Sequence, residues 1–161
     1  MVAVIAHALA VIRRDVLGNS ADPGHVAAAA LFHDASEIFT GDLPTPIKYF
    51  DPEIMAAYKR VESVASYKLL AALPAAMRPA YEELVAHENI ESLQLVKAAD
   101  TIAAYIKCLE ELKTGNKEFR LAAEQTRKKL DAYDLQEVKY FMANFISAFE
   151  LTLDELDFSF Q

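Results

Sequence analysis

Glycine and proline are confined to a few positions, and this constrains the fold more than any other feature of the sequence. There are only four glycines (Gly18, Gly24, Gly41 and Gly115), and the six prolines all fall where helices would begin or end. Because both residues interrupt helices, the long stretches between them, rich in Ala, Leu, Glu and Lys, can be helical. No run alternates apolar and polar residues for long enough to indicate a strand. The sequence therefore predicts an all-α fold.

Individual helix boundaries follow from caps and apolar periodicity. Asp22 and Pro23 are typical of a helix start, and the alanine-rich run after them predicts a helix to Phe39. The other helices are expected from the start to about Leu17, from Asp51-Pro52 to about Leu73, after Pro79, from Ile90 to Lys113, and twice more beyond Gly115. Two apolar faces indicate the core: Leu95, Ala98, Ala99, Ile102, Ile106 and Leu109 on one helix, and Val138, Phe141, Phe145 and Phe149 on the last long one.

The length of the chain fits one domain. At 161 residues, about two thirds of the unfolded surface can be buried on folding, which is enough for one core. We therefore expect a single helical bundle over residues 1–161. Its first helix lacks a capping residue, and its apolar pattern is already under way at Val2. We further expect that this domain lacks its N-terminal segment.

The charge balance narrows the range of partners. Acidic residues outnumber basic ones by 24 to 16, and the net charge of −8 repels nucleic acid polymers and anionic membranes. A small anionic substrate is compatible, because a divalent cation can reverse the potential within one pocket. The apolar opening segment ends at Arg13, Arg14 and Asp15, so it resembles neither a signal peptide nor a membrane span. The single cysteine, Cys108, indicates a buried inert thiol and a cytoplasmic protein.

His33, Asp34 and Glu37 form the first candidate site. If the second helix continues through them, Glu37 projects into the sector between the adjacent pair. A metal bound by the imidazole and the carboxylate would then have Glu37 within reach of its water, as acid and base catalysis requires. A His-Asp dipeptide alone is more often found at a surface or in a helix cap. The apolar run from Val26 to Phe32 favours a site, because it predicts partial burial, and an unpaired buried carboxylate is costly.

Asp100 raises the same question on another helix. Its apolar neighbours Leu93, Val96 and Ala103 predict a second semi-buried carboxylate. A cation shared with Asp34 would compensate both charges. The alternative is a salt bridge from Asp100 to Lys97 or to an arginine.

Three segments of the sequence together closely resemble the YfbR-type 5′-deoxynucleotidases of the HD superfamily. They are the run from His33-Asp34 through Glu37 and Gly-Asp-Leu-Pro-Thr to Phe50, the segment Lys97-Ala-Ala-Asp100, and Tyr105 to Leu112. The resemblance spans nearly the whole chain. It implies an HD-type helical fold, a homodimer, and hydrolysis of 5′-deoxyribonucleoside monophosphates to a deoxynucleoside and phosphate. It also implies a divalent metal cofactor, with cobalt favoured and manganese or another transition metal possible.

The resemblance also assigns roles to individual positions. His33, Asp34 and Asp100 match metal ligands, and the two aspartates also match substrate-binding residues. Glu37 matches the catalytic residue that activates or protonates water. The loop Asp42, Leu43, Pro44 and Thr45 matches a substrate-contacting segment. Asp42 would assist the leaving 5′-oxygen, or it would only cap or brace the proline loop; the sequence supports both readings.

The sequence departs from the family pattern at its start. A further ligand histidine, and an Arg-Trp pair that contacts phosphate and sugar, would align upstream of Met1. His7 lies too far along the first helix to match that ligand, so we interpret it as a packing or capping residue. Two alternatives to the deoxynucleotidase are another HD activity, on a cyclic nucleotide, a triphosphate or an alarmone, and a catalytically impaired nucleotide-binding module. The Gly-Asp-Leu-Pro-Thr loop favours the monophosphatase.

Overall fold

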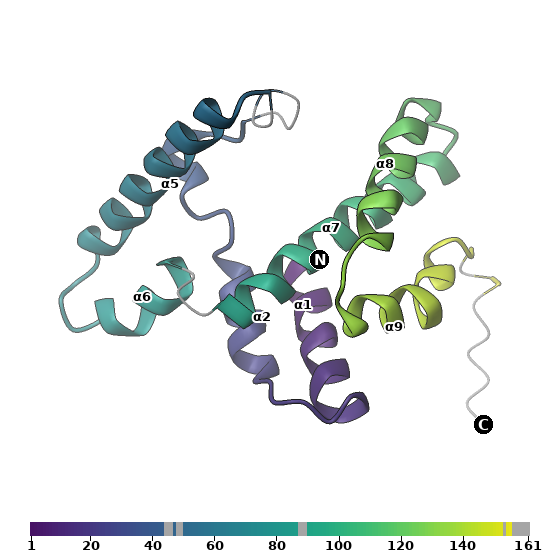
Figure 1. Ribbon diagram of the computed structural model, residues 1–161, viewed down its shortest axis with the longest axis horizontal. Coiled ribbons are helices and arrows are strands. Elements are labelled where there is room, and N and C mark those ends of the chain that lie inside the picture. The colour runs from purple at the N-terminus through teal and green to yellow at the C-terminus, as the bar shows by residue number, and fades with distance from the viewer. Residues whose placement is uncertain (44–46, 48–49, 87–89, 153, 156–161) are drawn as a thin grey trace.

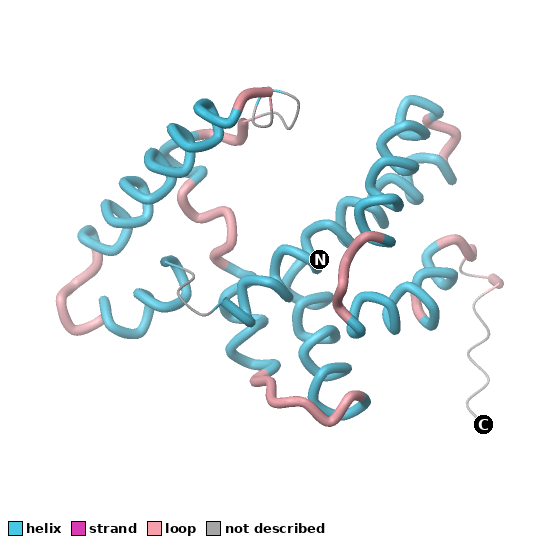
Figure 2. The backbone as a smooth tube through the Cα atoms, in the orientation of Figure 1, coloured by secondary structure: helices cyan, strands magenta, loops and turns pink. Residues whose placement is uncertain are grey.

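The computed structural model describes residues 1–43, 47, 50–86, 90–152 and 154–155, and all regular structure in these ranges is helical (Figures 1 and 2). The all-α prediction is confirmed. No helix in these ranges is long and apolar enough to cross a membrane. In chain order the elements are α1 (Val2–Val11), the π-helical turn η1 (Ile12–Val16), α2 (Pro23–Leu31), α3 (Glu37–Thr40), α5 (Pro52–Ala72), α6 (Arg78–Ala86), α7 (Ile90–Lys113), the 3₁₀ turn η2 (Lys117–Phe119), α8 (Arg120–Asp131), α9 (Gln136–Asn144) and the 3₁₀ turn η3 (Ile146–Phe149).

The predicted helix boundaries are confirmed wherever a local cap sets them. Asp22 caps α2 by accepting a hydrogen bond from the His25 backbone N–H at 3.1 Å. Asp51 caps α5 in the same way, with Glu53 as the donor at 2.6 Å. Gly115 follows α7 with a φ of +92°, a left-handed conformation that glycine adopts without strain.

The second helix is shorter than predicted. It ends at Leu31, and residues 32–36 form tight turns before α3 begins at Glu37. The His33 side chain accounts for the break: its ring Nδ1 bonds the Ala30 carbonyl oxygen, which would accept the Asp34 N–H in a continuous helix. The backbone then tightens to i→i−3 bonds, such as the one from the Glu37 N–H to the Asp34 carbonyl.

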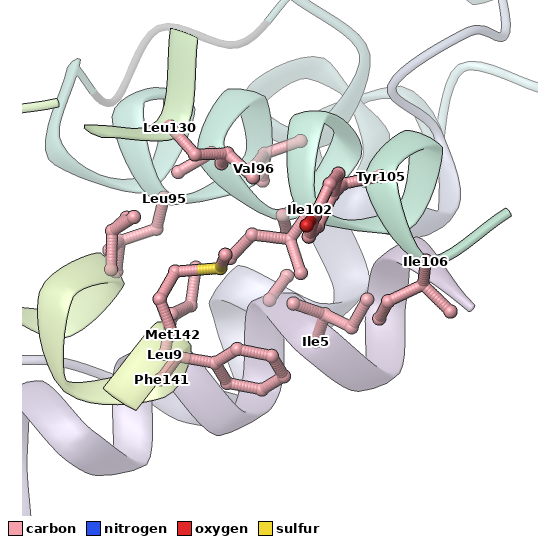
Figure 3. Packing of buried hydrophobic residues seen from close by; sticks show 14 of the residues in the cluster. Ile5, Leu9, Leu95, Val96, Ile102, Tyr105, Ile106, Leu130, Phe141 and Met142 are labelled. Carbon is pink, nitrogen blue, oxygen red and sulfur yellow. The ribbon is translucent and has the colours of Figure 1, made fainter. Parts of the chain in front are cut away.

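The core is centred on α7, which packs against α1, α2 and α8. Figure 3 shows labelled side chains of α1, α7, α8 and α9 meeting in one cluster, to which Val26, Ala29 and Ala30 of α2 also belong. The predicted α7 stripe is confirmed, since Leu95, Ala98, Ala99, Ile102 and Ile106 are fully or almost fully buried, while Leu109 is partly buried. Cys108 is also buried, and burial raises the pKa of its thiol, as expected for an unreactive cysteine.

The predicted apolar face of the last long helix is only partly correct. Val138 and Phe141 are buried, and Phe149 packs against the core from η3. Phe145, however, is 45% exposed. The cause is that α9 ends at Asn144, and Phe145 leaves the helical conformation with φ −120° and ψ −26°.

The hairpin of α5 and α6 stands apart from this core. α5 packs against α3 and α6, and Ala65 is its one buried residue. In Figure 1 it lies across from the α7–α8 pair, with the segment between α2 and α5 connecting the two parts. The fold therefore places one long helix opposite the face of α7 that carries Asp100.

Candidate active site

A cavity of about 820 Å³ lies between the α5–α6 hairpin and the α7–α8 pair. Four predicted site residues, His33, Asp34, Glu37 and Asp100, line it. The rest of its wall comes from α5 (Met55, Lys59, Glu62, Ser63, Ser66, Tyr67, Leu70), α6 (Glu82, Val85), α7 (Leu93, Val96, Lys97, Thr101), the α8 end (Lys129, Tyr133) and the turn after α2 (Phe32, Ser36). A smaller cavity of about 280 Å³ by Arg13 and His25 contains none of the predicted residues.

His33 is oriented by the backbone. Its Nδ1 lies 2.8 Å from the Ala30 carbonyl oxygen. Because a carbonyl only accepts hydrogen bonds, Nδ1 carries a proton, and Nε2 is the ring nitrogen that the backbone does not engage. Nε2 lies 2.8 Å from Asp34 Oδ2 and 3.8 Å from Asp100 Oδ1. The structure thus brings together side chains from the α2–α3 turn and from α7 that are 66 residues apart in sequence.

This arrangement is suited to a positive charge. A neutral imidazole would point its Nε2 lone pair at two carboxylate oxygens, so either a proton on Nε2 or a cation between the groups is needed. An imidazole nitrogen held by a backbone carbonyl, together with carboxylate oxygens, is a donor set used for divalent transition metals. The spacing of these three side chains is not that of a metal coordination shell. Across the described ranges, no three His, Cys, Asp or Glu side chains are close enough together to hold a metal ion.

Asp34 and Asp100 are more exposed than the sequence predicted. Their side chains are 56% and 58% exposed, whereas His33 is 22% exposed. Both carboxylates open onto the cavity instead of the core, so the prediction of semi-buried aspartates was wrong. The surrounding walls still displace water from Asp100, and this raises the pKa of its carboxyl; His33 opposes the shift, while Asp34 reinforces it. The alternative salt bridge from Lys97 does not form, since the ionic partner of Asp100 within the described residues is His33.

Glu37 and the loop after it occupy different places. Glu37 is half-buried at the start of α3 and lines the cavity. Asp42 is exposed and is not part of the cavity wall, although its charge raises the pKa of Asp100 slightly. Leu43 is half-buried, also away from the wall. Pro44 and Thr45 lie outside the described residues.

The base of the loop is fastened to α5. The Tyr58 hydroxyl donates a hydrogen bond of 2.9 Å to the Gly41 carbonyl oxygen and lies 3.5 Å from the Thr40 hydroxyl. Gly41 has a φ of +65°, which a residue with a side chain rarely adopts. The chain therefore turns sharply away from α3 just before Asp42.

His7 lies outside the site. It is exposed on α1 and does not line the cavity, so its interpretation as a packing or capping residue was wrong.

The sequence analysis did not predict the basic residues of the cavity. Three lysines, Lys59, Lys97 and Lys129, line the cavity. No local motif marks Lys59 or Lys129, and Lys97 was considered only as a partner for Asp100.

Comparisons with known proteins identify the family of the chain. Residues 1–149 match the YfbR-like family, described as 5′-deoxynucleotidase YfbR-like. The chain is 45% identical over 157 residues to a 5′-deoxynucleotidase of Vibrio parahaemolyticus, covering 96% of this chain and 81% of that protein. It is also 45% identical over 158 residues to the 5′-deoxynucleotidase YfbR of Salmonella arizonae, covering 96% of this chain and 79% of that protein.

A solved structure supports the fold. The chain superposes on an HD-domain phosphohydrolase from Listeria innocua with a TM-score of 0.76, covering 92% of this chain and 72% of the other. The sequence identity is 23%. At this identity the likeness concerns the helical architecture alone.

Proposed function

Because the chain belongs to the YfbR-like 5′-deoxynucleotidase family, we propose that it hydrolyses 5′-deoxyribonucleoside monophosphates to a deoxynucleoside and inorganic phosphate. One observation carries this proposal to particular residues: His33 Nε2, Asp34 and Asp100 meet at the wall of a cavity that Glu37 also lines. The HD-domain phosphohydrolase family implies dependence on a metal, and these three residues are our candidates for holding it.

The donor set suits a divalent cation. His33 would contribute Nε2, and Asp34 and Asp100 would contribute carboxylate oxygens; cobalt is favoured by the family resemblance, and manganese is the next candidate. Such a cation supplies an acidified water and neutralises phosphoryl oxygens. The bond from His33 Nδ1 to Ala30 keeps the ring in the tautomer that can donate Nε2.

Glu37 is the candidate for the proton transfers of the reaction. Its carboxylate orients the attacking water and accepts a proton as the oxygen attacks phosphorus. The bond between phosphorus and the 5′-oxygen then breaks, and the 5′-oxygen takes up a proton to become the hydroxyl of the deoxynucleoside. Asp42, just beyond Gly41, is the candidate for assisting this leaving oxygen, with bracing of the loop as its alternative role.

Preference for deoxyribose would come from the segment Asp42 to Thr45. This expectation rests on the resemblance, which matches the segment to a substrate-contacting one, and on Pro44 and Pro46 in the sequence, since each proline restricts one backbone angle and lacks one donor. We therefore expect dAMP, TMP and dCMP to be hydrolysed at similar rates and AMP much more slowly. Equal rates on AMP and dAMP would contradict deoxyribose selection and would indicate a general 5′-nucleotidase.

A homodimer is part of the same proposal. The α5 helix supports it, because a 21-residue helix with one buried residue leaves Ile54, Val61 and Val64 exposed. Apolar side chains at this spacing along one helix are suited to packing against a second copy.

A release assay for inorganic phosphate, with the nucleotide products also separated by chromatography, tests the proposal, because hydrolysis of cyclic AMP to AMP releases no inorganic phosphate. The substrates are dAMP, cyclic AMP and dATP, each with cobalt or manganese added. Release from dAMP alone supports the monophosphatase. Hydrolysis of cyclic AMP or dATP in preference to dAMP would favour another HD activity, and binding of dAMP without turnover would favour the impaired nucleotide-binding module.

A further inference from the structure

Three helices each direct one lysine to the cavity wall. Lys59 comes from α5, Lys97 from α7 and Lys129 from α8. The wall also carries five acidic residues, Asp34, Glu37, Glu62, Glu82 and Asp100. In a chain with a net charge of −8, these lysines are the positively charged side chains among the described residues of the cavity wall.

A phosphate group entering this cavity needs more positive charge than one cation provides. A phosphate monoester carries about −1.5 to −2 at neutral pH, and the candidate metal ligands Asp34 and Asp100 already contribute two negative charges. No arginine lines the described wall. Arg13 and Arg127 form ion pairs outside the cavity wall, with Glu137 and Asp131 respectively. Among the described residues of the wall, lysines are therefore the cationic side chains available to a phosphate group.

Two of the lysines lie beside Asp100. Lys97 is three residues before Asp100 on α7, so the two share a helix face one turn apart. Lys129 lies on the neighbouring helix α8 and lines the same cavity as Asp100. Lys59 belongs to α5, on the other side of the cavity.

A hydrogen-bonded contact holds the two helices together at this point. The Thr101 hydroxyl donates to the Lys97 carbonyl oxygen at 2.9 Å. The Tyr133 hydroxyl, at the end of α8, lies 3.4 Å from that carbonyl and 3.3 Å from the Thr101 hydroxyl. Tyr133 lies just beyond the end of α8, four residues after Lys129, and both residues line the cavity. These hydrogen bonds tie the backbone of Lys97 to the segment that follows Lys129.

We propose that Lys97 and Lys129 bind the phosphate group of the substrate from the α7–α8 wall, next to Asp100. This inference rests on the proposed function for the identity of the substrate. The two ammonium groups hold the non-bridging phosphoryl oxygens, and the rest of the 820 Å³ cavity is left for sugar and base. Lysine acts here as a point charge, which tolerates variation in the angle of approach.

The test uses Lys97→Gln and Lys129→Gln, with Lys128→Gln as the matched control. Lys128 is adjacent on α8, exposed, and absent from the cavity wall. We expect each test variant to raise the KM for dAMP and the inhibition constant of inorganic phosphate by at least about tenfold, the usual loss for a charged hydrogen bond. Inhibition by deoxyadenosine should change less than about twofold in all three variants, because it lacks phosphate. Lys97→Arg and Lys129→Arg should recover most of the phosphate affinity.

Two outcomes overturn the inference. One is that phosphate inhibition in Lys97→Gln and Lys129→Gln equals that of the control. The other is that phosphate and deoxyadenosine weaken together, which would indicate a distorted site and not a lost charge. Calorimetric titration of the chain with inorganic phosphate separates this inference from the proposed function. Phosphate binding that depends on the lysines, without dAMP hydrolysis, would support the lysine assignment and refute the proposed function. Hydrolysis of dAMP that is insensitive to both lysine substitutions would refute the lysine assignment and support the proposed function.

Discussion

Replacement of His33 by alanine should abolish the stabilisation of the fold by metal. In the folded chain the His33 Nε2 faces Asp34 and Asp100, and Asp100, which is 67 positions after His33 in the sequence, moves away from the adjacent His33-Asp34 pair on unfolding. A cation bound at this point therefore stabilises the folded state by mass action. The readout is the metal-induced change in melting temperature, not the melting temperature itself.

The expected magnitude follows from linkage. At a free metal concentration of 100 times Kd, the folded state gains about 2.7 kcal/mol. For a domain of this length each kcal/mol shifts Tm by about 2 to 4 °C, so cobalt should raise the Tm of the unchanged chain by about 5 to 11 °C. If His33→Ala weakens binding about 100-fold, the same metal concentration equals Kd and adds only about 0.4 kcal/mol, or about 1 °C. The variant also loses the hydrogen bond to Ala30, which should lower the free energy of unfolding without metal by about 0.5 to 1.5 kcal/mol. The metal-free Tm should fall accordingly.

Thermal unfolding followed by circular dichroism, with and without cobalt, measures these shifts. His7→Ala is the control, because His7 is exposed on α1 and lies outside the cavity. It should retain the full cobalt-induced shift. A shift in His33→Ala as large as in the unchanged chain would refute the ligand role of His33, and a loss of the shift in His7→Ala would identify His7 as the residue that completes the site.

Three further predictions address catalysis, packing and assembly. Glu37→Ala should reduce kcat for dAMP by about 10²-fold to 10⁴-fold while metal content measured by mass spectrometry stays unchanged, and a parallel loss of metal would reassign Glu37 as a ligand. Ile102→Ala should cost about 2 to 5 kcal/mol in urea unfolding because Ile102 is fully buried, whereas exposed Leu121→Ala should cost less than about 0.5 kcal/mol; equal costs would contradict the described core. Light scattering should show that the unchanged chain is a dimer and that the double variant Val61→Ser, Val64→Ser is a monomer. A monomeric unchanged chain would refute the dimer.

Several helix boundaries could be predicted from local sequence signals. Asp22, Asp51 and Gly115 mark helix ends through their own backbone and side-chain chemistry, so the boundaries they set were predictable. The break after Leu31 was not, because it depends on a bond from the His33 ring to Ala30. The run before it has strong helix formers and no breaker, and propensity alone favours continuing the helix.

The composition of the site was partly predictable for a similar reason. The His33, Asp34 and Glu37 spacing is local, whereas Asp100 was singled out by its apolar neighbours and matched to a metal ligand by the resemblance. The exposure of Asp34 and Asp100 depends instead on where the α5–α6 hairpin stands, and no pattern around either residue encodes that placement. Lys129 reaches the cavity only because α8 folds back along α7. Such contacts arise from tertiary packing and leave no periodic trace in the sequence.

The most direct test of the central claim is phosphate release from dAMP by the unchanged chain and by Asp34→Asn. Asp34→Asn keeps the shape of the side chain and removes the carboxylate nearest to His33 Nε2. We predict turnover by the unchanged chain with cobalt, its loss on chelation, its return on adding cobalt again, and a loss of at least about 10²-fold in kcat/KM for Asp34→Asn at every cobalt concentration. Turnover that survives chelation, or that is equal in Asp34→Asn, would contradict the assignment of this His-Asp cluster as the hydrolytic site.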